Sequence, residues 1–141
     1  MNKLLLVTIL VLSAYFFLAC NSGNSTPLNP NGDSELALLM REMESDALDM
    51  KKFVQTGRVP SGKYDHSTLF TATPTEEGKT SIPEYKTMAQ SYLEAMNMLQ
   101  SANRDNAVER YTNLVDMCLS CHKSMCPGPV VRIEKLFVEA D

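Results

Sequence analysis

Apolar residues recur every three or four positions in three segments of this chain, which is the spacing that places them along one face of an α-helix. The first segment lies between Ser34 and Gly57, the second begins at Ser81, and the third ends at Pro127. Because no sustained strand alternation accompanies them, the pattern predicts an all-α domain over residues 34–141. The stripes expected in its core are Leu36, Leu39, Met40, Met43, Ala47, Met50 and Val54 in the first segment, Tyr85, Met88, Ala89, Tyr92, Leu93, Met96 and Leu99 in the second, and Val108, Tyr111, Leu114, Val115, Cys118, His122 and Met125 in the third.

Residues with capping chemistry stand where these helices should begin. Ser34, or Asp33 before it, can accept a backbone N–H of the first turn. Ser81 and Glu84 match the capping-box pattern, and Asn106 can cap the third helix. These side chains predict the starts of all three helices.

Two shorter helices are expected besides these three. One runs from Tyr64 to Phe70, within the segment that joins the first two long helices. The other runs roughly from Val130 to Val138, after the Pro127-Gly128-Pro129 sequence, which removes backbone donors and fixes φ. With the 64–70 helix as its fourth member, the predicted architecture is a four-helix bundle followed by a short C-terminal helix.

The first twenty residues have the features of an export signal. Lys3 precedes an apolar stretch over residues 4–18, and these 15 residues fall short of the ~20 that span a bilayer. The sequence Phe17-Leu18-Ala19-Cys20 resembles a bacterial lipoprotein box, in which cleavage precedes the cysteine and the cysteine is lipidated. We therefore expect a signal peptide over 1–19, a lipid on Cys20 and a flexible tether over 20–33, with ordinary secretion as the alternative.

Charge narrows the possible functions. The 141 residues include 13 Lys and Arg against 17 Asp and Glu, which gives a net charge of −4. A nucleic-acid-binding protein needs a basic face to neutralise phosphates, so no nucleic acid is expected as a partner. An acidic surface instead favours protein partners with basic docking surfaces. The four cysteines suit neither a dense disulfide scaffold nor a paired zinc module, so their positions decide their meaning.

Three of the cysteines and one histidine lie close together near the end of the third helix. Cys118-Leu119-Ser120-Cys121-His122 is the attachment signature of c-type haem. Residues three and four apart share one face of a helix, so both thiols and the imidazole project together. The thiols can form thioethers with the haem vinyl groups, and the imidazole can bind the iron. Because such attachment takes place outside the cytoplasm, the motif agrees with the export signal, and one covalent haem c is the expected cofactor.

The same residues allow other interpretations. Cys118 and Cys121 could form a thioredoxin-like dithiol, although such a pair normally follows a strand. They could form a zinc site with His122 and Cys126, although zinc ligands usually come from two separate segments. A disulfide between residues three apart within a helix would have poor geometry. Cys126 itself is expected as a small buried apolar residue, with a redox role as the alternative.

The second axial ligand of the iron decides between two functions. A strong ligand opposite His122 makes an electron carrier, whereas an open position makes a protein that binds or scavenges small gases such as nitric oxide. Met40 and Met43 on the first predicted helix are candidate thioether ligands. His66, in the segment between the first two long helices, is either a solvated loop residue or a further candidate ligand. From the residues alone these options stay open.

A helical bundle with Cys118–His122 near the end of its last long helix resembles cytochrome c-prime. It is more closely similar to the low-spin relatives in which a methionine of the first helix is the sixth ligand. Ser34–Arg41 and Cys126–Pro129 also resemble a branch of exported, lipoprotein-type bundle cytochromes. The resemblance covers roughly residues 34–126. It implies a cytochrome c-prime-like bundle with a shortened second helix, and Met40 as the distal iron ligand, with Met43 as its competitor.

Taken together, the residues and the resemblance predict an exported monohaem c-type cytochrome that carries single electrons and is not an enzyme. Its expected location is the cell envelope, where the lipid on Cys20 would anchor it to a bacterial membrane, facing the periplasm or the exterior. Its expected partners are redox proteins, and the chain is either a monomer or a homodimer.

Overall fold

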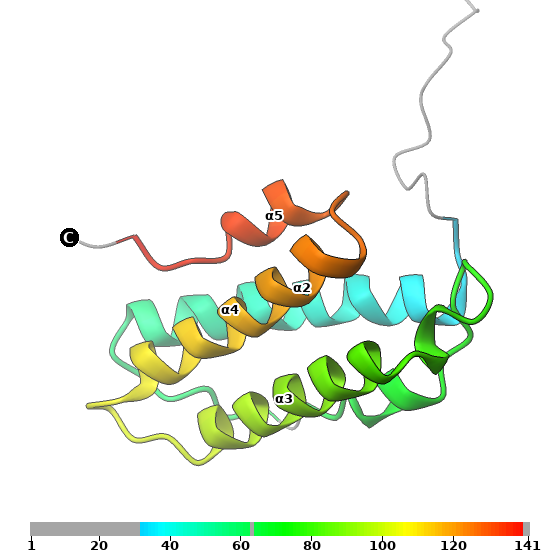
Figure 1. The fold of residues 1–141 in the computed structure, drawn as a ribbon. Helices are drawn as coiled ribbons and strands as arrows, with labels where there is room; N and C mark the ends of the chain where they lie inside the picture. The colour runs from blue at the N-terminus through cyan, green and yellow to red at the C-terminus, as the bar shows by residue number, and fades with distance from the viewer. Residues whose placement is uncertain (1–31, 63, 140–141) are drawn as a thin grey trace, which may run out of the picture. The chain divides into compact units, whose positions relative to one another are not determined.

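The computed structural model describes residues 32–62 and 64–139, and within these ranges the chain forms helices and loops without a β-strand. The predicted all-α class is confirmed for this part of the chain. The predicted signal peptide (1–19), Cys20 and most of the tether lie outside the described residues. In chain order the elements are α2 (Glu35–Gln55), the 3₁₀ helices η1 (Ser67–Phe70) and η2 (Lys79–Ser81), α3 (Pro83–Gln100), α4 (Ala107–Met125) and α5 (Val130–Glu134) (Figure 1).

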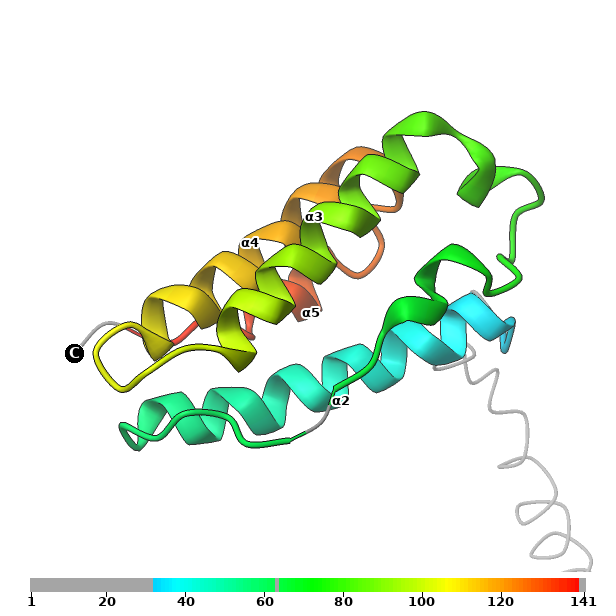
Figure 2. The same ribbon diagram turned by 90° about the horizontal axis from the view of Figure 1, so that it is seen from below.

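Three long helices enclose the core. α3 and α4 run antiparallel after a tight connection and share the most extensive helix–helix contact (Figure 2). α2 packs against α4 from the opposite side of the core, and α5 folds back onto α4 (Figure 1). Arg132 of α5 forms an ion pair with Glu44 of α2, and Lys51 Nζ donates to the carbonyl oxygen of Lys135 over 2.9 Å. These contacts join the C-terminal segment to the first helix of the domain.

The predicted apolar stripes form most of this core. The register differs in the first turn of α4, where Ala107 is buried and Val108 is 44% exposed. The expectation that Val108 belongs to the core was therefore wrong. The buried residues of the long helices are Leu39, Met43, Ala47, Met50 and Val54 on α2, Tyr85, Ala89, Tyr92, Ala95, Met96 and Leu99 on α3, and Ala107, Tyr111, Leu114 and Val115 on α4.

The helix ends confirm some of the predicted caps and correct others. Ser34 caps α2, because its Oγ accepts the backbone N–H of Ala37 over 3.2 Å. Ser81 does not cap α3, because it belongs to η2 and the helix starts after Ile82 without a side-chain cap. Asn106 is the N-cap residue of α4, but its side chain accepts the backbone N–H of Asn103 instead of one from the helix.

A glycine just after α2 ends the helix. Gly57 has φ +66°, in the left-handed region that favours glycine, and its N–H donates to the carbonyl oxygen of Val54 over 3.0 Å. A side chain at this position would strain the turn. The predicted stop at Gly57 is thus confirmed.

The segment between α2 and α3 runs back along α2 (Figure 2). The helix predicted over 64–70 is the shorter 3₁₀ helix η1. Four residues of the segment are buried: Pro60, His66, Leu69 and Ala72. The predicted C-terminal helix is also shorter than expected, because α5 ends at Glu134 rather than Val138.

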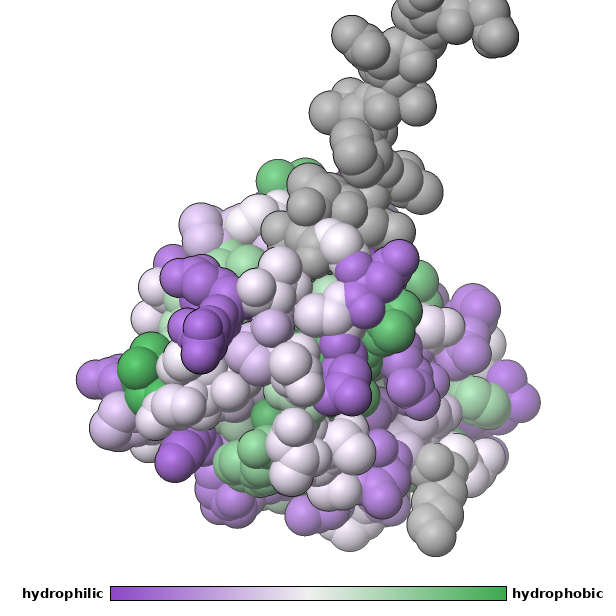
Figure 3. All heavy atoms as spheres, turned by 90° about the vertical axis from the view of Figure 1, so that its right-hand side faces the viewer, coloured by the Kyte–Doolittle hydropathy of each residue, from purple (hydrophilic) through white to green (hydrophobic). Residues whose placement is uncertain are grey.

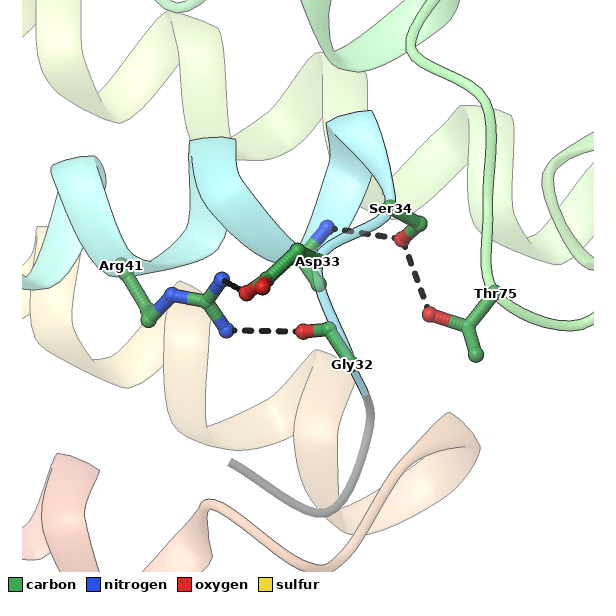
Figure 4. A network of polar contacts seen from close by, with 6 residues as sticks. Gly32, Asp33, Ser34, Arg41 and Thr75 are labelled. Atoms are coloured by element: carbon green, nitrogen blue, oxygen red, sulfur yellow. Dashed lines mark hydrogen bonds and ion pairs between the residues drawn. The ribbon is translucent and has the colours of Figure 1, made fainter. Parts of the chain in front are cut away.

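A polar cluster at the start of α2 fixes the far part of this segment. Ser34 Oγ lies 2.8 Å from the hydroxyl of Thr75, and Arg41 binds Asp33 and the carbonyl oxygen of Gly32 (Figure 4). Two residues after Ser34, the backbone N–H of Leu36 donates to the carbonyl oxygen of Thr73 over 3.0 Å. The connecting segment is therefore tied to the helix that precedes it.

One end of the domain carries η2 and the start of α2. Polar and charged side chains cover most of this end, with small separate apolar patches between them (Figure 3). None of the helices among the described residues combines the length and the apolar character needed to cross a membrane.

Candidate functional site

A cavity lies among α2, α3 and α4, with η1 closing part of its wall. Its empty volume is about 360 Å³, including the part that opens to solvent. Apolar side chains make up most of its surface, so a ligand inside it would be shielded from water. The residues that line the cavity are Met40, Met43, Leu69, Tyr85, Ala89, Tyr92, Met117, Cys118, Cys121 and His122.

α4 brings Cys118, Cys121 and His122 to this cavity together. Their spacing places all three on the same side of the helix, as the sequence predicted. They lie in the last two turns of α4, which ends at Met125 before the Pro127-Gly128-Pro129 sequence. The residue types that attach and ligate a haem therefore share one wall of one cavity.

The two thiols in the cavity are poor nucleophiles by themselves. Shielding from water raises the pKa of Cys118 to about 12, and the neighbouring Cys121 adds to the effect. The pKa of Cys121 is also raised, by desolvation first and by Cys126 second. Thiol redox enzymes need the thiolate and keep its pKa low, so this environment does not favour the dithiol interpretation. Cys118, Cys121 and Cys126 are all free cysteines.

His122 has a fixed orientation. Its Nδ1 lies 3.0 Å from the backbone carbonyl oxygen of Cys126, which can only accept, so Nδ1 carries the proton. Desolvation lowers the pKa of His122 more than this hydrogen bond raises it. The ring is therefore neutral at neutral pH and has a free lone pair on Nε2, which is the state that a metal ligand requires.

α2 contributes thioether sulfurs to the same cavity. Met40 and Met43, one turn apart, both line it, so both predicted thioether candidates for the distal ligand reach the site. Met50 lies deeper in the core with 0% exposure. Met117 also lines the cavity and was not expected there, although its position four residues before Cys121 places it on the same helical face.

His66 does not line the cavity. It is buried, with 2% exposure, so the interpretation as a solvated loop residue was wrong. Its Nδ1 lies 2.8 Å from the hydroxyl of Tyr92, and its Nε2 lies 2.9 Å from Oδ2 of Asp46. Both ring nitrogens are thus engaged with other partners, and neither is directed at the cavity as a free ligand.

Two tyrosines of α3, Tyr85 and Tyr92, complete the wall and were expected only as core residues. The Tyr85 hydroxyl donates to the carbonyl oxygen of Leu69 over 2.8 Å. Burial raises the pKa of Tyr85 to about 12 and raises that of Tyr92 further. Both rings are therefore neutral, and they add polar atoms without adding charge.

Within residues 32–62 and 64–139, no three His, Cys, Asp or Glu side chains come together in an arrangement that would hold a metal ion directly. Comparison of the chain with protein-family models, curated proteins and solved structures gave no match.

Proposed function

We propose that this cavity holds one covalently attached haem c and that the protein carries single electrons. One observation supports this above the others: two thiols, a neutral imidazole and three thioethers, supplied by α2 and α4, line a single apolar cavity. Cys118 and Cys121 would form the thioether links. His122 would bind the iron through Nε2, and Met40 would be the distal ligand.

The residues present fit a haem. The walls of the cavity are apolar, as those of cofactor sites usually are. The donors are those that haem iron takes in electron carriers, where a methionine opposite a histidine raises the reduction potential. When bound, the haem supplies an iron centre that gains or loses one electron.

The chain's own residues have three tasks in this proposal. The carbonyl oxygen of Cys126 holds the His122 ring in one orientation and one tautomer. The neutral rings of Tyr85 and Tyr92 would shield the α3 side of the bound group from water. Met40, as a ligand of the iron, would keep small molecules away from the metal, which would favour electron transfer over gas binding. The protein would therefore perform no bond chemistry on a substrate.

The proposed architecture is a cytochrome c-prime-like four-helix bundle. α2, α3 and α4 are three of its helices, and the 57–80 segment with η1 takes the place of a shortened second helix. In support, Leu69 of η1 lines the cavity beside α3. The segment would thus cover the side of the haem that a longer helix covers elsewhere.

The proposed location is the bacterial cell envelope. Residues 1–19 would direct export, a lipid on Cys20 would hold the protein at a membrane, and the 20–33 tether would let the domain reorient. The net charge of −4 favours basic redox partners. Association with them should weaken as salt concentration rises.

The proposal is tested by producing the full chain in a host that attaches c-type haem. Intact mass should show one added haem, and the ferric and ferrous spectra should be low-spin. The control is the double variant Cys118→Ser, Cys121→Ser, which should carry no covalent haem. A wild-type mass without haem would contradict the proposal, and a five-coordinate ferrous form that takes up nitric oxide would replace electron transfer with gas binding.

A further inference from the structure

A chain of hydrogen bonds leads from the cavity wall to the protein surface through His66. Tyr92 lines the cavity, and its hydroxyl lies 2.8 Å from His66 Nδ1. The two rings are also stacked, with centroids 5.8 Å apart. On the other side, His66 Nε2 lies 2.9 Å from Asp46 Oδ2, and the Asp46 side chain is 27% exposed. A buried imidazole thus stands between the cavity and a solvent-accessible carboxylate.

The geometry allows His66 to be neutral or protonated without losing either partner. The carboxylate can only accept, so Nε2–H donates to Asp46 in both states. When the ring is neutral, Nδ1 accepts the Tyr92 O–H. When the ring is protonated, Nδ1–H donates to the Tyr92 oxygen instead. A proton can therefore be added at Nδ1 inside the protein while both ring nitrogens keep a hydrogen-bond partner.

The titratable groups around the ring are carboxyl, hydroxyl and thiol groups. α2 presents Asp46, with Asp49 one turn further along the helix, and α3 presents the neutral Tyr92. The connecting segment adds Tyr64, whose pKa is raised by desolvation and by the two aspartates, and Asp65, whose Oδ1 accepts the N–H of Ser67. Cys118 of α4, which lines the cavity, contributes to the raised pKa of Tyr92. No lysine or arginine contacts the ring in the interactions of the described residues.

We propose that His66 is a proton-binding site coupled to the redox state of the cavity. The inference rests on the proposed function. An electron that enters the cavity from a one-electron donor protein makes its interior more negative, and the low dielectric of the interior transmits this change to His66. One proton from solvent then forms the N–H bond at Nδ1, and oxidation releases it. The electron and the proton together leave the net charge of the domain unchanged.

The test is the reduction potential of the haem-loaded full chain, measured from about pH 5 to about pH 9, where imidazoles ordinarily titrate. The potential should fall as pH rises. Coupling of one proton to one electron changes the reduction equilibrium up to tenfold per pH unit, which corresponds to about 59 mV. His66→Gln should abolish this dependence, because an amide can bridge Tyr92 and Asp46 but does not titrate in this range.

A second variant keeps the test decisive where His66→Gln fails to fold. Asp46→Asn removes the anionic partner of the protonated ring and should move the pH-dependent region to lower pH. Asp49→Asn is the matched control, since it removes the same charge from the same helix at a carboxylate that binds Lys52. Because Asp46 binds the ring and Asp49 does not, the control should shift the curve less than Asp46→Asn does. At one fixed pH, NMR of the His66 ring nitrogens should also show more N–H at Nδ1 in the reduced protein than in the oxidised protein.

The outcomes separate the two proposals. A haem-loaded protein with a pH-independent potential would overturn the role of His66 and leave the electron carrier intact. An equal pH dependence of the potential in wild type, His66→Gln and Asp46→Asn would also overturn the role of His66 and leave the electron carrier intact. A chain that attaches no haem would overturn the proposed function, and the inference about His66 with it.

Discussion

His122 and Cys126 hold each other in place at the end of α4. The His122 side chain donates from Nδ1 to the Cys126 carbonyl oxygen over 3.0 Å, and the Cys126 backbone N–H donates to the His122 carbonyl oxygen over 3.0 Å. Both bonds use the backbone of Cys126 and neither uses its thiol. The residue that follows, Pro127, cannot continue the helix, so the carbonyl of Cys126 is available to the imidazole.

This relationship predicts that Cys126→Ser leaves the site intact. The backbone carbonyl stays in place, so His122 should keep its orientation, and haem content and absorption spectra should match those of the wild type. Cys121→Ser makes the same change from thiol to hydroxyl at a proposed attachment position. It should leave the haem held by a single thioether, with a shifted ferrous spectrum. Loss of haem from Cys126→Ser would show that its thiol takes part in attachment.

The choice between Met40 and Met43 can be made with two matched variants. Leucine keeps the volume of each side chain and removes its sulfur. Met40→Leu should abolish the absorption band that a methionine–iron bond gives the ferric protein and should lower the reduction potential, because methionine ligation raises it. Met43→Leu should leave both unchanged. The reverse pattern would identify Met43 as the ligand, and no change in either variant would contradict methionine ligation.

The long helices could be predicted because burial follows directly from local periodicity. The apolar stripe of α2 supplies core residues from Leu39 to Val54, because an amphipathic helix buries its apolar face. The proximity of Cys118, Cys121 and His122 could be predicted for a similar reason. Their spacing within one helix fixes their relative positions without any knowledge of the rest of the chain.

The environment of His66 could not be predicted, because its partners are distant in sequence. Asp46 lies 20 residues before it and Tyr92 lies 26 residues after it. A histidine in a polar segment gives no local sign of such contacts. The predicted cap at Ser81 was wrong for a related reason. The segment before α3 forms η2, and Ser81 belongs to this turn instead of the start of the helix.

Tyr111 should contribute measurably to stability. It is fully buried, and its hydroxyl lies 3.1 Å from the carbonyl oxygen of Ala47 and 2.8 Å from that of Leu136. Tyr111→Phe would leave both carbonyl groups without this donor in an apolar environment. We expect the free energy of unfolding to fall by about 1–2 kcal/mol, measured by chemical denaturation. An unchanged midpoint and slope would show that neither contact contributes.

The contact between Glu35 and Thr73 should make the start of α2 sensitive to acid. Glu35 Oε2 accepts the backbone N–H of Thr73 over 2.9 Å and its hydroxyl over 2.7 Å. These two hydrogen bonds lower the pKa of Glu35 from its ordinary value of 4.5, the backbone bond having the larger effect. A carboxyl group with a lowered pKa stabilises the folded state above its unfolded pKa, and this contribution is lost as pH falls through the lower, folded value.

The amide of Thr73 reports this transition directly. In an NMR titration its proton chemical shift should move with a midpoint below 4.5, as Glu35 takes up a proton and the hydrogen bond to the carboxylate weakens. Glu35→Gln keeps an acceptor oxygen but cannot titrate, so the same amide should show no such step. Glu76, which binds Lys79 at the surface, is the matched position: Glu76→Gln should leave the Thr73 step unchanged. A Thr73 midpoint at or above 4.5, or a step that persists in Glu35→Gln, would show that the carboxylate does not hold the connecting segment to α2.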